Sequence, residues 1–155
     1  MSKPQNVKGV FYLTRAFVPL LEKSATPEDP ARIINIGSVA GITPQEAPTH
    51  AYDISKAAVH QLTRKFAADF APKGITVNCL APGYVPSRMS AGLTSYLSSA
   101  DAIAQNIPLR RMGNDDDMAG ACIYLSSRAG AWCTGVILNV DGGAVGAQQI
   151  PLSSL

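Results

Sequence analysis

The sequence lacks the features that mark membrane, secreted and nucleic-acid-binding proteins. No uninterrupted apolar run among its 155 residues is long enough to cross a bilayer, and the opening MSKPQNVKG has no apolar core of a secretory signal. Charge is scarce too: 15% of the residues are charged, the formal net charge is +2, and the densest basic spot is LRR at residues 109–111. A charge this small and scattered does not favour nucleic acid. We therefore expect neither a membrane nor a nucleic acid as a partner.

Cysteine is also scarce. Cys79, Cys122 and Cys133 are odd in number and form no C-x-x-C pair, and each has apolar or small neighbours. This context favours buried thiols in a reducing compartment, so the cytoplasm is the expected location. His50 and His60 share no metal-ligand spacing with cysteine or acidic residues. We expect ordinary polar or surface positions for both histidines, and no metal site.

The sequence does contain alternating helix and strand patterns. Apolar residues at helical spacing predict helices over residues 6–24, 52–71 and 114–127. Short β-rich runs that end in glycine predict strands over residues 32–37, 75–83 and 135–143. This order predicts an α/β fold, a parallel sheet covered by helices. Pro19 interrupts the first helical stripe, and the β-branched run from Arg32 indicates a strand buried on both faces.

The third helix begins with an acidic run, Asn114 followed by three aspartates. Carboxylates at a helix start satisfy its first N–H groups and oppose its dipole. We therefore interpret this run as a solvated N-cap in preference to a metal site.

Tyr52 and Lys56 stand four residues apart where the second helix begins. This spacing places both side chains on one helical face. A tyrosine has an ordinary pKa of about 10, too high for efficient proton transfer at neutral pH, and a nearby ammonium favours its phenolate form. The pair therefore has the chemistry of a proton-delivery device. Chance also produces such pairs easily, so the rest of the chain must decide.

Five segments, in order, resemble the C-terminal half of a short-chain dehydrogenase/reductase. They are NVKG at Asn6, IINIGSVAG ending at Gly41, YDISKAA at Tyr52, ITVNCLAPG ending at Gly83, and TGVILNVDGG ending at Gly143. The resemblance covers nearly the whole chain. It implies the C-terminal portion of a doubly wound, Rossmann-type parallel sheet, as one partial domain over residues 1–155. Within it, residues 84–112 would form a substrate lid.

The resemblance also implies roles for the catalytic residues. Tyr52 would be the general acid, or the base in the reverse direction, and Lys56 would also bind the nicotinamide ribose. Ser38 would hold the substrate oxygen, and Asn6 would support a water-mediated proton relay to the lysine. Taken without the family resemblance, Ser38 could simply be a small residue in a turn after a strand, and Asn6 could be the N-cap of the helix that follows it.

The same resemblance assigns cofactor contacts after the second strand. Gly83, Val85 and Ser87 match positions that contact NADP or NAD, although threonine is commoner where Ser87 stands. Gly142 and Gly143 are better read as turn glycines than as cofactor contacts. Trp132, Tyr84 and Tyr96 are expected to pack or to line a substrate mouth.

The residues around the site look most like the β-ketoacyl reductase branch of rhamnolipid-type and other secondary metabolism. A 3-oxoacyl or polyketide-like ketone, interconverted with its secondary alcohol, is therefore the expected substrate. The family also implies a homo-oligomer formed through the two long helices.

The glycine-rich phosphate loop that precedes these motifs in the family does not occur in the sequence. We therefore expect the N-terminal nucleotide-binding half to be missing, and the chain alone to be poorly stable and without a competent dinucleotide site. A truncated, non-catalytic remnant that binds a homologous subunit is the alternative. A chain that borrows its nucleotide half from a second polypeptide is a third possibility.

Overall fold

The computed structural model describes residues 5–44, 48–87 and 99–147. These residues form a parallel sheet in the order β1-β2-β3, with bounds β1 (Ala31–Ile36), β2 (Ile75–Pro82) and β3 (Ile137–Val140). The longer helices are α1 (Gln5–Ser24), α2 (His50–Phe70) and α5 (Asp115–Ser126). Shorter helical turns are η1 (Val39–Gly41), η2 (Ala71–Lys73), α4 (Ala100–Asn106) and η3 (Arg128–Gly130). The predicted α/β fold is confirmed.

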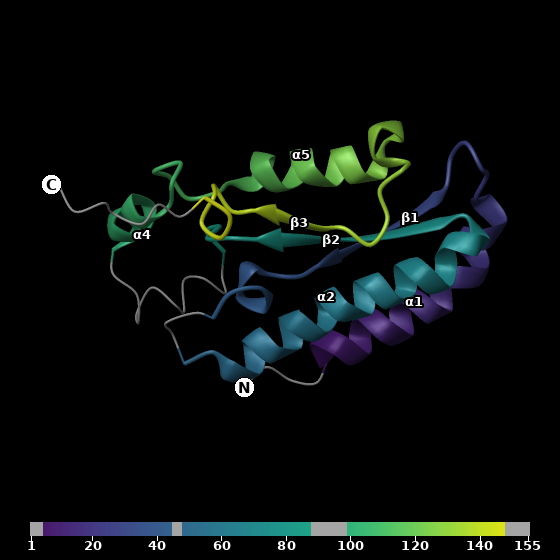
Figure 1. The fold of residues 1–155 in the computed structure, drawn as a ribbon, viewed down its shortest axis with the longest axis horizontal. Coiled ribbons are helices and arrows are strands. Elements are labelled where there is room, and N and C mark those ends of the chain that lie inside the picture. The colour runs from purple at the N-terminus through teal and green to yellow at the C-terminus, as the bar shows by residue number, and fades with distance from the viewer. Residues whose placement is uncertain (1–4, 45–47, 88–98, 148–155) are drawn as a thin grey trace, which may run out of the picture.

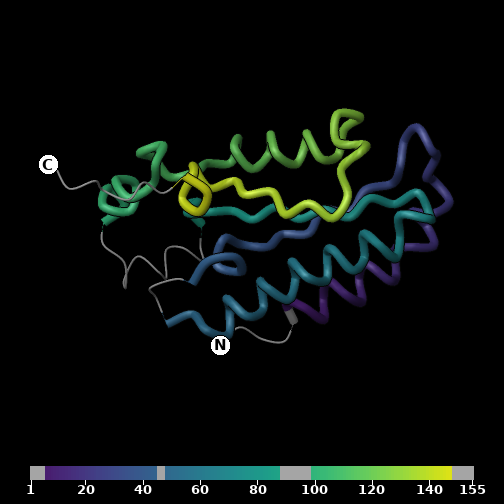
Figure 2. The backbone as a smooth tube through the Cα atoms, in the orientation of Figure 1, coloured from purple at the N-terminus to yellow at the C-terminus, as the bar shows by residue number. Residues whose placement is uncertain are grey.

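Helices cover both faces of the sheet (Figure 1). α1 and α2 lie side by side on one face, and α5 lies on the other. Because the strands are parallel, the segments that follow them turn at one common edge, as the tube in Figure 2 shows. Chemistry-bearing residues that follow different strands are thereby brought to the same edge.

The middle strand, β2, is buried along almost its whole length, from Ile75 to Ala81. β1 is less buried than the sequence pattern predicts: only Ala31 and Asn35 of this strand are buried, and Ile36 is 52% exposed. Among the described residues, β1 pairs with β2 alone and stands at the edge of the sheet. Its other side is therefore not covered by a neighbouring strand, which leaves its side chains more exposed.

The core between α1, α2 and the sheet is aromatic and aliphatic. Phe66 stacks on Phe11 and Phe70, with ring centroids 5.7 and 5.0 Å apart. Buried Val18, Ala31, Phe66, Ala67, Ile75 and Val77 complete this cluster. Aromatic pairs at such distances add to the free energy gained by burial, so α2 is firmly fixed to the sheet.

The predicted extent of the first helix is confirmed: α1 runs through Pro19, which interrupts only the apolar stripe, and ends at Ser24. Proline removes one backbone donor and strains the preceding turn. Val18 and Leu21, on either side of it, pack in the core, and this anchorage keeps the helix continuous. Pro19 itself is exposed.

The predicted cap of the third helix is confirmed. The Asn114 side chain accepts a hydrogen bond from the Asp117 N–H at 3.0 Å, and the Asp117 carboxylate accepts one from the Asn114 N–H at 2.9 Å. This reciprocal pair is a capping box, which satisfies two donors at the start of α5.

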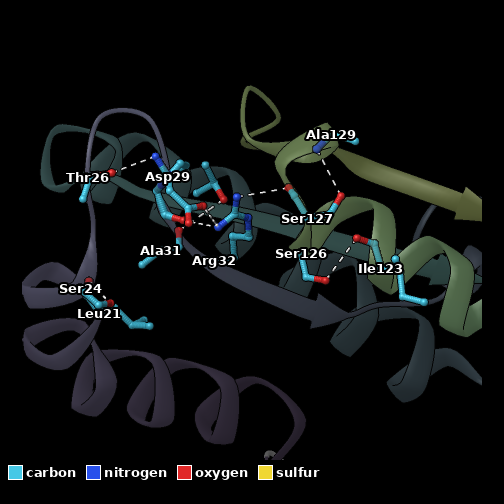
Figure 3. A network of polar contacts seen from close by, with 12 residues as sticks. Leu21, Ser24, Thr26, Asp29, Ala31, Arg32, Ile123, Ser126, Ser127 and Ala129 are labelled. Carbon is cyan, nitrogen blue, oxygen red and sulfur yellow. Dashed lines mark hydrogen bonds and ion pairs between the residues drawn. The ribbon is translucent and has the colours of Figure 1, made fainter.

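At the opposite edge of the sheet, Arg32 ties the start of β1 to the end of α5 (Figure 3). Its guanidinium donates to the carbonyl oxygens of Pro30 at 2.6 Å and Ser127 at 3.2 Å, and lies 2.7 Å from the Asp29 carboxylate. This network is structural, because it lies at the amino end of the strand and away from the ligand-binding edge.

Two further expectations need correction. Cys79 is buried, as predicted, but Cys122 and Cys133 are only half-buried, because their segments cover the sheet from outside. Trp132, expected to pack or line a mouth, is 99% exposed at the turn after η3. No helix in the described ranges has the length and apolar character needed to span a bilayer.

Candidate active site

The predicted proton-delivery pair lies at the carboxyl end of β1. Lys56 Nζ donates a hydrogen bond to the Ile36 carbonyl oxygen at 2.9 Å and lies 5.6 Å from the centre of the Tyr52 ring. α2 begins just before Tyr52, at His50, so its first turns present both side chains to the strand end. The ammonium is thus close to the phenol ring and anchored to β1.

Burial changes the chemistry of the lysine. Loss of water lowers the pKa of Lys56 from its ordinary 10.5, while the nearby Cys79 thiol acts in the opposite direction. The bond to Ile36 uses one of the three N–H donors of the ammonium. Further donors can therefore serve a hydroxyl-bearing ligand at the sheet edge.

Ser38 lies two residues beyond the end of β1, at the start of η1. Its backbone is extended, with φ −172° and ψ 152°, and its Oγ accepts the Ala40 N–H at 3.2 Å. This bond orients the side chain. A hydroxyl that accepts a bond still carries its own proton, which it can donate to a ligand oxygen.

The expectation of an ordinary polar or surface position for His60 is wrong, because this side chain is only 4% exposed. Its Nε2 accepts the Ser38 N–H at 3.4 Å. Burial lowers the pKa of His60 below its ordinary 6.5. The spacing of Tyr52, Lys56 and His60 could have indicated that His60 lies beside the site, because steps of four residues put all three side chains on one helical face.

Asn6 lies inside α1, one residue after the helix begins, so it does not cap this helix. Its side-chain Nδ2 donates to Ser55 Oγ at 3.3 Å, and Ser55 Oγ donates to the Tyr52 carbonyl oxygen at 2.7 Å. The contact brings Asn6 to the residue next to Lys56. The structure therefore connects all four predicted catalytic residues to the start of α2 or the end of β1.

The predicted cofactor contacts follow β2, one strand away from Ser38. The Gly83 N–H donates to the Val140 carbonyl oxygen at 3.0 Å, and a Cβ at Gly83 would lie 2.8 Å from Asp141 Cα. Glycine is thus needed where the ends of β2 and β3 approach each other. Val85 is half-buried and Ser87 is exposed.

A hollow of about 430 Å³ opens beside this edge, between the end of β3 and the start of α5. It is lined by Tyr84, Arg111, Asp117, Asp141 and neighbouring residues. Arg111 binds the Asp117 carboxylate through two hydrogen bonds, at 2.6 and 2.8 Å. Arg111 is the largest cause of the lowered pKa of Asp117, which falls to about 2.

The two glycines after β3 are turn residues. Gly142 and Gly143 have φ of 64° and 88°, in the left-handed region that favours glycine. The Asp141 carboxylate holds this turn by accepting the N–H groups of Gly143 and Val145, each at 2.9 Å. Within the described residues, no group of three His, Cys, Asp or Glu side chains is placed to hold a metal ion.

Part of the predicted site lies beyond what the structure describes. The expected lid covers residues 84–112, of which 88–98, including Tyr96, lie outside the described residues. The described part contains α4, whose Ser99 N-cap accepts the Ala102 N–H at 3.3 Å.

Comparison with known proteins identifies relatives over nearly the whole chain. The family model described as "Enoyl-(Acyl carrier protein) reductase" matches residues 4–145. The rhamnolipids biosynthesis 3-oxoacyl-[acyl-carrier-protein] reductase of Pseudomonas aeruginosa is 44% identical over 138 residues, which cover 89% of this chain and 54% of that protein. A galactitol 2-dehydrogenase of Rhizobium johnstonii is 38% identical over 139 residues, covering 89% of this chain and 52% of that protein.

Solved structures give the same result. The Pseudomonas aeruginosa RhlG/NADP active-site complex superposes with a TM-score of 0.83 at 43% identity, over 90% of this chain and 54% of that one. A putative 2-deoxy-d-gluconate 3-dehydrogenase from Agrobacterium tumefaciens with bound NADP gives 0.77 at 35% identity, over 90% of this chain and 55% of that one. The chain thus spans about half the length of the relatives it matches. It belongs to the short-chain dehydrogenase/reductase family.

Proposed function

We propose that the protein containing this chain is an NADP-dependent oxidoreductase that interconverts a ketone and a secondary alcohol, with Tyr52 as its general acid and base. The observation that carries this proposal is the position of Lys56. Its ammonium lies 5.6 Å from the Tyr52 ring centre and binds the end of the strand that leads to Ser38. A positive charge beside a phenol stabilises the phenolate form, so that the tyrosine gives up its proton more readily at neutral pH.

The residues at the sheet edge fit the nicotinamide half of a dinucleotide. The Tyr52 hydroxyl and the Lys56 ammonium can bind the ribose hydroxyls, and Asn6 supports α2 beside them. The adjacent strand end supplies three further features: a close backbone turn at Gly83, an apolar contact at Val85 and a hydroxyl at Ser87. When bound, NADP supplies or accepts the hydride. Both solved structures described above hold NADP, which supports NADP over NAD.

Each catalytic residue has one task in the proposed reaction. Ser38 donates its hydroxyl proton to the substrate oxygen and holds this oxygen near Tyr52. Tyr52 transfers its proton to the oxygen in the direction of reduction and removes it in the direction of oxidation. Lys56 stabilises the phenolate left behind, and Asn6 connects α1 to this helix through Ser55.

The proposed substrate is a 3-oxoacyl or polyketide-like ketone from secondary metabolism. The relative named for rhamnolipid biosynthesis supports this class, while the galactitol dehydrogenase points to polyols. We further propose that residues 84–112 form the lid over the substrate. The three cysteines are free thiols, which supports a cytoplasmic location.

The test is a steady-state assay of the intact protein that contains this chain. NADPH and NADH are each offered with 3-oxoacyl thioesters, enoyl thioesters and polyols. Oxidation of NADPH with 3-oxoacyl thioesters supports the proposal. If only enoyl thioesters or polyols turn over, the substrate class is wrong. If nothing turns over and NADPH does not raise the Tm, a non-catalytic protein that binds a homologous subunit is the better description.

We also propose that the protein forms a homo-oligomer through α1 and α2. Four large apolar side chains of α1 and one of α2 are 49–69% exposed, namely Tyr12, Leu13, Phe17, Leu20 and Ile54. An apolar patch of this kind on two adjacent helices is typical of a protein interface.

Sedimentation velocity tests this assembly. Leu13→Lys with Leu20→Lys should convert the oligomer to smaller species, because two charges cannot be buried at an apolar interface. Ile123→Lys, at an equally exposed apolar residue of α5, is the matched control. An unchanged sedimentation coefficient for the double variant, or an equal loss with the control, would exclude an interface through α1 and α2.

A further inference from the structure

His60 is a buried side chain that the proposed reaction does not use, yet it contacts the segment that carries Ser38. It lies one helical turn beyond Lys56 on α2, and only 4% of it is exposed. Lys56 donates to the Ile36 carbonyl oxygen, and His60 accepts the Ser38 N–H. Two consecutive turns of α2 therefore bind the chain on both sides of Gly37.

The segment from Gly37 to Gly41 is shaped around the imidazole. A Cβ at Gly37 would lie 2.2 Å from His60 Nε2, and a Cβ at Gly41 would lie 2.8 Å from His60 Cε1. No real Cβ approaches a ring this closely, so position 37 needs glycine while His60 is present. At Gly41 the backbone of Lys56 and Ala57 would also lie 2.7 Å from a Cβ, so α2 itself requires glycine there. The Ser38 bond is long, at 3.4 Å, so this packing places the ring as much as the hydrogen bond does.

We propose that His60 is a positioning residue, whose neutral imidazole accepts the Ser38 N–H through Nε2 and thereby fixes the Ser38 hydroxyl relative to Tyr52. The inference rests on the proposed role of Ser38 in holding the substrate oxygen. Ser38 lies in the short link between β1 and η1, where its carbonyl oxygen accepts the Gly41 N–H at 3.0 Å and its own N–H is bound by His60. A displacement of a fraction of an ångström at such a residue reduces the rate without preventing binding.

The proposal requires a particular protonation state. Nε2 must carry no proton, so the ring proton is on Nδ1, and an imidazolium cannot accept the Ser38 N–H. The charged and titratable groups around the ring favour this neutral form. Burial and the cations Arg64 and Lys56 on α2 lower the pKa of His60, against a hydrogen bond to the Gly41 backbone that raises it. Cys79 of β2 also faces the ring, and burial raises the pKa of its thiol, which keeps it neutral.

Kinetics of the intact protein test the catalytic consequence. His60→Leu keeps similar volume and removes the acceptor, so kcat should fall about tenfold while KM for NADPH is unchanged. His60→Gln places a non-titrating oxygen near the Nε2 position, so kcat should stay within about twofold of wild type. The decline of wild-type kcat at acidic pH should be weaker in His60→Gln. His50→Gln, at the exposed histidine, should behave as wild type.

Nitrogen NMR of the histidine side chains tests the contact without any activity. His60, identified by the signal missing in His60→Gln, should show an unprotonated Nε2 and a pKa below the ordinary 6.5 of histidine. A proton on Nε2, or a wild-type kcat in His60→Leu, would overturn the proposal. His60 could show the expected NMR signals while the protein reduces no ketone. The proposed function, and with it the catalytic purpose of the contact, would then be wrong, but the contact between His60 and Ser38 would still be established.

Discussion

The two faces of the sheet are held in different ways. On the α2 face, the helix buries five residues, and polar contacts are inside: Asn35 donates to Thr63 Oγ1 at 2.9 Å, and Ser38 donates to His60. On the other face, α5 buries only Leu125 among its described residues, and its polar contacts, such as the pair of Arg111 and Asp117, face solvent.

This difference explains where the proposed chemistry lies. Buried polar contacts hold their atoms in one arrangement, because an unpaired partner would be costly. Exposed ion pairs exchange partners with water and add little to stability. On the α2 face the buried bond to His60 can therefore hold Ser38 in one position, while Lys56 and Asn6 are held by more exposed hydrogen bonds. The α5 face supplies the wall of an open hollow, where less precision is required.

The largest expected effect comes from the reacting hydroxyl on the α2 face. Tyr52→Phe should lower kcat/KM for ketone reduction by about 10²–10⁴-fold, because it removes the general acid and leaves the ring in place. The control is Tyr124→Phe on α5, which removes a hydroxyl that contacts Cys133 at 3.3 Å. Steady-state kinetics of the intact protein should show no loss for Tyr124→Phe. Equal effects of the two changes would refute the functional contrast between the faces.

The same substitution should have opposite effects on stability on the two faces. Gly37→Ala puts a methyl group 2.2 Å from His60 Nε2 and 2.8 Å from Cys79 Sγ, so overpacking should cost about 1–3 kcal/mol of unfolding free energy. A Cβ at Gly120, inside α5, would meet no atom within 4 Å beyond its chain neighbours and the backbone of its own helix, so Gly120→Ala should stabilise by about 0.5–1 kcal/mol. Urea unfolding measures both changes, and a neutral Gly37→Ala would show that the α2 face can relax.

The sequence predicted the elements and the proton-delivery pair better than it predicted burial. Periodicity located the helices and strands, and the spacing of Tyr52 and Lys56 implied their common face. It could not show that His60 is buried, because this depends on two glycines from another element that leave room for the ring. The resemblance also implied that the first strand would offer an unpaired apolar edge, and among the described residues β1 stands at the sheet edge with Ile36 exposed.

A smaller effect is expected at the start of α5. Asn114→Ala removes the acceptor for the Asp117 N–H and should cost about 1 kcal/mol of unfolding free energy. Asp116→Asn, an exposed neighbour in the same first turn, should change stability by less than about 0.5 kcal/mol. Urea unfolding of both variants measures the contribution of the cap. A cost at Asp116 equal to that at Asn114 would mean that charge, and not capping, stabilises this end.

The smallest effects should separate the two faces by pH. Burial lowers the pKa of His60, so the unfolded chain binds its proton more readily, and stability should decrease as the pH falls below about 6.5. Asp117, whose pKa is lowered from 3.8 to about 2 by Arg111, contributes stability that is complete above pH 3.8 and lost as the pH falls to about 2. Thermal unfolding measured across pH should therefore show two declines in Tm, a first below about pH 6.5 and a second between pH 3.8 and about 2. The first decline should be absent in His60→Gln and the second in Asp117→Asn. Added salt should weaken only the second, because that pair is exposed and the imidazole is not. A salt-sensitive first decline would mean that water reaches His60, and the buried and exposed faces would no longer be distinct.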